Sequence, residues 1–501
     1  MIHYSCNVAS FHEVQHGRDR LRTAPTEQPP RKLSGKRTVL REHLESGASR
    51  AHRRGAHFDL QTGEALRYMN RWGIDAGSRY FEQHGRRCQL DLDHVMPRIA
   101  VLGAGITGVT TAYALAQRGH TITVYERHRY AAMETSFANG GQLSASNAEV
   151  WNSRATLLKG VRWMFTRDAP LLLNPRPSWH KYSWIGDFLR QIPNYESNTV
   201  TTVRLAIAAR EYLFGIAQRE KIEFDHERRG ILHFYSTRKE HDAAARVNQL
   251  LRAGGLDRRA VTPEEISIIE PALSGDFYGG FFTESDSTGD IHKFTRGLSA
   301  ASERHGVTFH YDTPVQSIAS DSSGVSVTTG QCTEMFDSIV ICAGVGSRQF
   351  AAMVGDHVNV YPVKGYSITV HLDDENSRQS APWVSLLDDR AKIVTSRLGA
   401  DRFRVAGTAE FNGANRDIRA DRVEPLVKWV RCYFPGVNTA RVLPWAGLRP
   451  MLPSMLPRVG RGRRPGIFYN TGHGHLGWTL SGATAEAVVQ LIDEGLRRTN
   501  R

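Results

Sequence analysis

Cysteine is scarce in this chain. The 501 residues include only Cys6, Cys88, Cys332, Cys342 and Cys432. These form no CxxC pair and have no metal-ligand spacing to histidine. The sequence therefore predicts neither a disulfide framework nor a metal site, and such sparse cysteine is typical of a reducing, cytoplasmic compartment.

Long apolar runs and a secretory leader are also missing from the pattern. No apolar run approaches the roughly 20 residues that a membrane-spanning helix needs, and the chain does not open on a basic segment followed by an apolar core. With 40% hydrophobic and 23% charged residues, the composition is that of a globular protein. The net charge of +13 favours anions or anionic surfaces and does not by itself indicate nucleic acid.

Residues 1–96 lack the periodic apolar faces that offset the entropy of ordering. We expect a poorly ordered basic extension, either lying upstream of a natural start at Met96 or forming a genuine flexible or targeting arm. Its arginines are not interleaved with aromatic residues and match no nucleic-acid-reading motif, so we predict no nucleic-acid partner. A nucleic-acid or protein-binding role of the arm is the alternative, and it requires a steep salt dependence of DNA binding that is lost with the arm.

A glycine-rich turn follows directly on an apolar strand. Gly103, Ala104, Gly105, Ile106, Thr107 and Gly108 come after the strand Ile99–Leu102 and open a helix that stops at Gly119. The strand Thr121–Tyr125 then ends at Glu126. The spacing predicts a Rossmann-type dinucleotide-binding unit, in which the glycines bring the backbone close to a pyrophosphate.

The acid after the second strand limits which dinucleotide fits. Glu126 is placed to accept from a ribose 2′-hydroxyl, although Arg127 beside it leaves a 2′-phosphate open. This unit alone does not separate NAD from FAD. The late strand ending at Gly344 and the Gly/His loop Asn470–Thr479 favour a flavin, because a helix that starts after this loop would face the reduced ring.

From Arg98 onward, the chain resembles the bacterial FAD-dependent D-amino-acid dehydrogenases of the glycine/D-amino-acid oxidase superfamily. The matching strings span roughly 400 residues. They are Arg98–Tyr113, Glu134–Ser136, Ala138–Asn139, Gly141–Gln142, Lys159–Phe165, Ala169–Leu171, Glu270–Leu273, Tyr361–Ser367, Gly447–Met451, Asn470–Gly474 and Leu476–Thr479.

This resemblance implies an α/β fold, α+β overall, with a Rossmann-type FAD-binding domain and a mixed-sheet substrate domain that are discontinuous in sequence. We expect residues 97–180, 274–356 and 441–501 in the FAD-binding domain, and 181–273 and 357–440 in the substrate domain. The implied reaction is oxidative deamination of D-amino acids, with hydride transfer from the substrate Cα to flavin N5. A glycine-, sarcosine- or hydroxyproline-type amine oxidase that uses oxygen is the alternative.

The resemblance also assigns cofactor residues along the chain. It places FAD against the turn with its flanking strand, the acid and its neighbour, the isoalloxazine loop, the adenine contact, the late glycine and the C-terminal loop. In order these are Ile99, Leu102, Gly103, Ala104, Gly105, Ile106, Thr107 and Gly108; Glu126 and Arg127; Ser136, Asn139, Gly140 and Gly141; Val315; Gly344; and Gly472, His473, Gly474 and Thr479. From the residues alone, His473 and His475 are equally well interpreted as loop histidines that bond to the backbone.

Two residues are expected to act on the substrate. A guanidinium binds a carboxylate through two parallel hydrogen bonds, and Arg449 lies in a proline-rich segment, so we expect it to hold the substrate carboxylate, although an ordinary surface ion pair also fits the pattern. Tyr366 is expected to cover the pocket or to bond to the substrate, with ordinary packing as the alternative. Lys364 is expected to be solvated.

Tryptophans and basic residues alternate between residues 151 and 190. Trp151, Trp163, Trp179 and Trp184 are interleaved with Lys159, Arg162, Arg167, Arg176, Lys181 and Arg190. Such a segment suits peripheral contact with the inner face of the cell membrane, where a quinone or another respiratory acceptor takes the electrons. Amphipathic helices that cover the substrate domain with a solvated basic face are the alternative.

Overall fold

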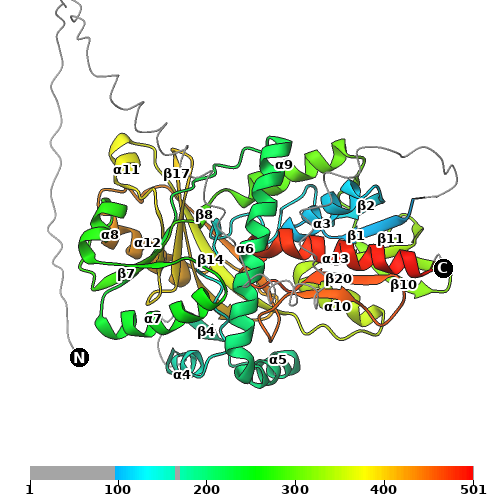
Figure 1. Cartoon of the computed structure of the whole chain (residues 1–501), viewed down its shortest axis with the longest axis horizontal. Coiled ribbons are helices and arrows are strands. Elements are labelled where there is room, and N and C mark those ends of the chain that lie inside the picture. Colours follow the sequence, from blue (N-terminus) through cyan, green and yellow to red (C-terminus); the bar gives the residue numbers. More distant parts are fainter. Residues whose placement is uncertain (1–95, 164–169, 500–501) are drawn as a thin grey trace, which may run out of the picture. The chain divides into compact units, whose positions relative to one another are not determined.

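The computed structural model describes residues 96–163 and 170–499, so the predicted basic extension lies outside the described residues except for Met96. Two large sheets, a three-stranded sheet and a two-stranded sheet are described (Figure 1). The first large sheet has six strands. In spatial order they are β19 (Arg458–Arg461), β20 (Ile467–Thr471), β13 (Ser338–Ile341), β1 (Arg98–Leu102), β2 (Thr121–Tyr125) and β9 (Thr308–His310).

The centre of this sheet is parallel and buried on both faces. β1 pairs in parallel with β2 and with β13, and β20 pairs in parallel with β13. Ile99, Val101, Ile122 and Val124 are at most 1% exposed, as is expected of strands that are covered on both sides. The predicted strand–turn–helix–strand unit is present as β1, α3 (Ile106–Gln117) and β2.

Helices from distant parts of the sequence cover this sheet. Apolar side chains of α3, α6 (Tyr195–Glu220), α9 (Ile291–Arg304) and α13 (Gly477–Thr499) form one core with β1 and β2. Figure 1 shows α13 beside β20 and α6. The last helix is therefore packed into the same core as the first described strand.

The second large sheet has nine strands and is mixed. Its path is β18 (Val442–Met451), β14 (Tyr361–His371), β17 (Arg402–Phe411), β16 (Ile393–Leu398), β15 (Ser385–Asp388), β5 (Ile231–Tyr235), β7 (Gly279–Thr283) and β6 (Arg259–Val261), with β4 (Leu171–Leu173) paired to β17. β14 is antiparallel to both β18 and β17. Its register with β17 shifts between Lys364 and Tyr366, and this bulge re-aims the side chains around it.

The remaining elements complete the described chain. The small sheets are β10 (Val315–Asp321), β11 (Gly324–Thr329) and β12 (Thr333–Phe336), and β3 (Gln142–Leu143) with β8 (Ser287–Thr288). The other helices are α4 (Arg154–Trp163), α5 (Trp179–Arg190), η1 (Ile192–Asn194), α7 (Arg238–Ala253), α8 (Pro263–Ile269), η2 (Gly344–Gly346), α10 (Ser347–Met353), α11 (Glu375–Ser380) and α12 (Ala420–Tyr433). In the part of the chain that the structure describes, no helix combines the length and apolarity of a bilayer span.

The division into two domains stays a prediction. The six-stranded sheet draws all its strands from the ranges predicted for the FAD-binding domain. β4, β7 and β18 also fall in those ranges, yet they pair within the nine-stranded sheet. Strand pairing thus places these three segments with the predicted substrate domain.

Candidate active site

The turn between β1 and α3 holds its backbone tightly at two glycines. Gly103 has φ of +102°, and a Cβ on Gly108 would lie 1.8 Å from the carbonyl oxygen of Gly103. Both positions therefore require glycine. Gly105 differs, because a Cβ there would meet only Ser136 Oγ, at 3.6 Å. The space in front of Gly105 belongs to a large cavity that this residue lines.

The first residues of α3 present backbone donors to the cavity. The amide of Ile106 donates to Ser136 Oγ at 3.0 Å. Among the described residues, none accepts from the amides of Gly105 and Thr107, which both line the cavity. Free amides at a helix N-terminus, where the helix dipole is positive, bind phosphate groups. The turn therefore has the donors that a pyrophosphate needs.

Glu126 closes the turn from the end of β2. Its Oε2 accepts from the Ala104 amide at 2.7 Å, and its Oε1 accepts from the His128 amide at 2.9 Å. Each carboxylate oxygen keeps a lone pair for a further donor such as a ribose hydroxyl. The neighbouring Arg127 forms an ion pair with Glu134, so its charge is already matched without a 2′-phosphate.

A loop before β3 forms the next part of the cavity wall. Asn139 Oδ1 accepts from the Gly141 amide at 2.9 Å, and Gly141 has φ of +70°. Arg404 of β17 donates to the Asn139 carbonyl at 3.1 Å and ties the loop to the nine-stranded sheet. The loop is thus fixed by hydrogen bonds at the place predicted for the isoalloxazine ring.

The loop before α13 lines the same cavity as the first turn. Gly472 and Gly474 have φ of +78° and +59°. Burial lowers the pKa of His473 to about 3, and its Nε2 lies 3.0 Å from Thr484 Oγ1. The neutral imidazole therefore holds the loop to helix α13. No described residue accepts from the amides of Gly477 and Trp478. The N-terminus of α13 therefore gives the cavity a second set of free donors.

Most of the predicted cofactor residues line this one cavity of about 980 Å³. The lining includes Leu102, Gly103, Gly105, Ile106, Thr107, Glu126, Arg127, Ser136, Asn139, Gly140, Gly141, Val315, Gly344, Gly472, His473, Gly474 and Thr479. Ile99, Ala104 and Gly108 are outside the lining. Ile99 and Ala104 are fully buried, and Gly108 packs on Gly103. Their contribution is to shape the turn, and the contact of each lining residue with the cofactor stays a prediction.

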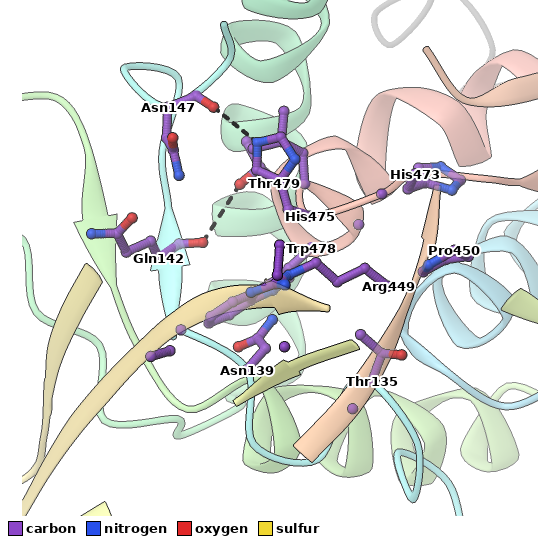
Figure 2. A pocket seen from close by; sticks show the side chains of 18 of the residues that line it. Thr135, Asn139, Gln142, Asn147, Arg449, Pro450, His473, His475, Trp478 and Thr479 are labelled. Atoms are coloured by element: carbon purple, nitrogen blue, oxygen red, sulfur yellow. Dashed lines mark hydrogen bonds between the residues drawn. The ribbon is translucent and has the colours of Figure 1, made fainter. Parts of the chain in front are cut away.

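Arg449 enters the cavity from β18. Its guanidinium lies over Gly365 of β14, where a Cβ would be 2.3 Å from Nη1, and Nη1 donates to the Thr408 carbonyl at 2.9 Å. Figure 2 shows the side chain reaching from its strand toward Trp478. No Asp or Glu among the described residues forms an ion pair with it, and burial lowers its pKa to about 10. An enclosed guanidinium that lacks a counter-ion is suited to bind an anionic group such as a carboxylate.

Tyr366 and Lys364 are both turned toward Glu410. The Tyr366 hydroxyl donates to Glu410 Oε2 at 2.7 Å, and Lys364 Nζ lies 3.2 Å from the same oxygen. The expectation that Lys364 is solvated is wrong: it is 0% exposed, held by Glu410, Asn415 and the Asp417 carbonyl. Tyr366 lines the cavity, but its single hydroxyl proton is already given to Glu410. Its role toward substrate stays a prediction.

Several polar residues that line the cavity were not among the predicted site residues. Gln142, Thr408, His475 and Trp478 each carry a buried polar atom without a hydrogen-bond partner among the described residues: Oε1, Oγ1, Nδ1 and Nε1 respectively. Buried polar atoms are normally satisfied. These atoms, the free amides at two helix starts and the volume of the cavity fit a large polar ligand of the dinucleotide type.

The fold and the cavity together define a dinucleotide-binding oxidoreductase. A family model described as "FAD dependent oxidoreductase" (DAO) matches residues 98–491, and the chain belongs to this family. The cofactor of the family is FAD, which fits the cradle between Gly105 and Trp478. The predicted FAD requirement and the predicted α/β fold class are confirmed.

Relatives and solved structures are similar to the same part of the chain. "D-amino acid dehydrogenase 3" of Mesorhizobium japonicum is 62% identical over 400 residues, 79% of this chain and 97% of the relative. A D-amino acid dehydrogenase of Paramagnetospirillum magneticum is 39% identical over 407 residues, 79% of this chain and 94% of the relative. The predicted resemblance to these dehydrogenases is confirmed.

Solved structures support the fold alone. Glycine oxidase from Geobacillus kaustophilus has a TM-score of 0.63 at 22% identity, covering 80% of this chain and 95% of that one. L-proline dehydrogenase from P. horikoshii has a TM-score of 0.62 at 17% identity, covering 80% and 94%. Their different substrates within one fold mean that the substrate of this chain has to be argued from its own cavity.

Proposed function

We propose that this protein is an FAD-dependent dehydrogenase that oxidises D-amino acids to imino acids. The observation that carries the proposal is Arg449, an enclosed guanidinium without a carboxylate partner in the cavity that also holds the dinucleotide cradle. The D-amino acid dehydrogenases of M. japonicum and P. magneticum, at 62% and 39% identity, supply the substrate class.

The residues of the cavity orient the substrate and control its proton. Arg449 binds the α-carboxylate through parallel hydrogen bonds and so fixes the Cα toward the cradle. Bound FAD would supply the acceptor for the α-hydrogen and its electron pair. The amine has to be neutral at that moment, and the charge of Arg449 disfavours a second cation beside it. Burial is the main cause that lowers the pKa of His475 to about 4, and the charges of Arg449 and Lys392 add to it.

The proposal is tested by anaerobic mixing of purified protein with D- and L-amino acids while flavin absorbance is followed. Bleaching by D-isomers alone is the expected result. Bleaching by L-isomers, or by neither isomer, overturns it. An oxygen electrode run beside a dye or quinone assay separates the proposed dehydrogenase from the oxygen-using amine oxidase of the alternative.

We also propose that α4 and α5 meet an anionic bilayer, where a quinone takes the electrons. Figure 1 shows both helices by the same end of α6. They expose large apolar side chains next to exposed arginines. These are Leu157, Leu158, Trp179, Tyr182 and Leu189, with Arg154, Arg176 and Arg190. Exposed apolar side chains rimmed by basic ones suit an anionic lipid surface.

Two parts of the predicted membrane segment do not reach this face. Trp184 is 2% exposed and stacks on Phe188, and Lys181 is 3% exposed and donates to the Asn174 carbonyl. The side chain of Trp163 lies outside the described residues. α4 nevertheless separates the cavity from the exposed face, because Ala155 and Thr156 line the cavity while Leu158 is 73% exposed.

Vesicle sedimentation tests this face. We expect binding to vesicles with phosphatidylglycerol and little binding to pure phosphatidylcholine, with Leu158→Glu and Trp179→Glu both weakening it. Ile268→Glu is the matched control, since Ile268 is 78% exposed on α8. Equal binding of all variants rules out this surface as the membrane contact. That outcome has no bearing on the proposed oxidation of D-amino acids.

A further inference from the structure

We call one part of this cavity the second chamber. Its wall is formed by β5, by α7 and by the turn between β15 and β16. His233 and Tyr235 of β5 and Arg258, just before β6, line it, and they are 5%, 6% and 4% exposed. None of the contacts assigned to FAD or to the α-carboxylate above involves these three side chains.

Arg258 is a further cation of the cavity wall that lacks an ion-pair partner among the described residues. Its guanidinium carbon lies 4.8 Å from the centre of the Phe281 ring. Its Nε has no hydrogen-bond partner, and no carboxylate among the described residues forms an ion pair with it. Arginine is almost never fully buried without a paired anion. The chamber is therefore built to receive an anionic group.

The carboxylates that line the chamber do not supply this charge. Glu149 accepts from the Tyr195 hydroxyl at 2.6 Å, and Asp389 is ion-paired with Lys392. Glu240 Oε2 accepts from the Thr237 amide at 3.2 Å as part of the α7 cap, and Glu196 is exposed. Each of the three less exposed carboxylates has its own donor, and none of them forms an ion pair with Arg258.

Each of the two arginines acts together with Lys392 on a histidine. Arg449 and Lys392 both act on His475, whereas Lys392 and Arg258 both act on His233. Burial, with these last two charges, holds the pKa of His233 well below its usual range, and its Nε2 lies 3.0 Å from Ser146 Oγ. His233 is thus a neutral neighbour that does not add to the charge near Arg258.

We propose that Arg258 binds a carboxylate on the substrate side chain, so that acidic D-amino acids of the D-glutamate and D-aspartate class are preferred. Arg449 then holds the α-carboxylate at one end of the substrate and Arg258 holds the second carboxylate at the other. This inference rests on the proposed function and narrows its substrate class.

The test compares D-glutamate with D-glutamine, which has the same shape and no charge. In the wild type, kcat/KM for D-glutamate exceeds that for D-glutamine, and in Arg258→Gln this ratio falls by about 10- to 100-fold, the size of a hydrogen-bonded charge pair. Arg258→Lys keeps part of the preference, because it keeps the charge. Bound flavin is measured in each variant to show that it is folded.

Arg259→Gln is the matched control. Arg259 is the next residue and also lies over a phenylalanine ring, but it is exposed and ion-paired with Glu265 at 2.7 Å. The D-glutamate to D-glutamine ratio stays at the wild-type value in this variant. An equal fall in Arg259→Gln, or the same loss for both substrates in Arg258→Gln, overturns the inference.

A binding measurement separates this inference from the proposed function. Glutarate, a dicarboxylate, perturbs the flavin spectrum of the wild type at lower concentration than butyrate, and Arg258→Gln removes the difference. If D-alanine bleaches the flavin but neither glutarate nor D-glutamate is preferred, the inference alone fails. If no D-amino acid bleaches the flavin, the proposed function fails first.

Discussion

The two large sheets contribute to the cavity in different ways. The six-stranded sheet ends in turns that present main-chain groups, as at Gly105, whereas the nine-stranded sheet presents charged side chains, as at Arg449. Main-chain donors are fixed as soon as the turn forms. The effect of a charged side chain depends on the group it is paired with. Lys364 and Arg449 lie on neighbouring strands, but Glu410 neutralises Lys364, whereas Arg449 has no ion-pair partner among the described residues.

The largest effect on flavin binding is expected where the main chain is closest to itself. Gly108→Val puts side-chain atoms into the Gly103 carbonyl, 1.8 Å from the new Cβ, and overpacking of this kind costs about 1–3 kcal/mol or more. We expect protein without bound flavin and a lower unfolding midpoint. Gly186→Ala on α5 is the control, since a Cβ there meets nothing within 4 Å. A flavin-loaded Gly108→Val protein would contradict the role of this turn.

The next effect concerns the unpaired arginine of the other sheet. Arg449→Gln removes the charge that holds the α-carboxylate, so kcat/KM for D-amino acids is expected to fall by about 100-fold or more, while flavin stays bound. Arg441→Gln is the control, because Arg441 is 61% exposed and pairs with Asp373. Unchanged steady-state kinetics of Arg449→Gln would remove this residue from the site.

The paired lysine should respond in stability more than in substrate binding. Glu410→Gln leaves Lys364 buried without its counter-charge, and breaking such a pair costs about 3–5 kcal/mol. Urea unfolding measures the loss, with Glu375→Gln, whose carboxylate is 72% exposed, as the control. An unchanged midpoint would show that the Asn415 and Asp417 contacts hold the ammonium without Glu410.

The smallest effect is expected at the edge of the main-chain site, at Glu134. Burial raises the pKa of this carboxyl, but hydrogen bonds from Arg416 and His128 outweigh it and bring the pKa to about 2. A pKa below the ordinary 4.5 means stability that is present above pH 4.5 and lost as the pH falls toward 2. Glu134→Gln is therefore less stable than wild type by about 1 kcal/mol at pH 6. The gap closes by pH 2, and a gap that is the same at both pH values contradicts the assignment.

The main-chain half of the site could be predicted because its signal is local. The strand Thr121–Tyr125 and the strand–turn–helix before it depend on neighbours in sequence, and the structure has them. The final helix was expected after the loop Asn470–Thr479 and begins at Gly477, because a glycine and histidine run hides its first turn. β4 has no local signal in the sequence, and it forms through pairing with β17, more than 200 residues away.

The side-chain half could not be predicted because pairing is set by tertiary contacts. Arg258 and Arg259 are adjacent and chemically identical, yet one is 4% exposed without an anion and the other is exposed beside Glu265. Lys364 faces Glu410 only through the register of β14 with β17 at a bulge. Neither the burial of Arg258 nor the contact of Lys364 with Glu410 can be recognised from residue spacing in the sequence.

The parallel pairing of β1 with β13, and of β13 with β20, has a consequence for biosynthesis. The ribosome releases β1 long before its partner at Ser338–Ile341 exists, and the loop Gly472–Thr479 emerges later still. The flavin pocket is consequently completed only late in synthesis, and β1 lacks its β13 neighbour while more than 200 residues are made, although its other edge pairs with β2. Supply of flavin while translation is under way should not rescue truncated chains from aggregation, whereas chaperone capacity should.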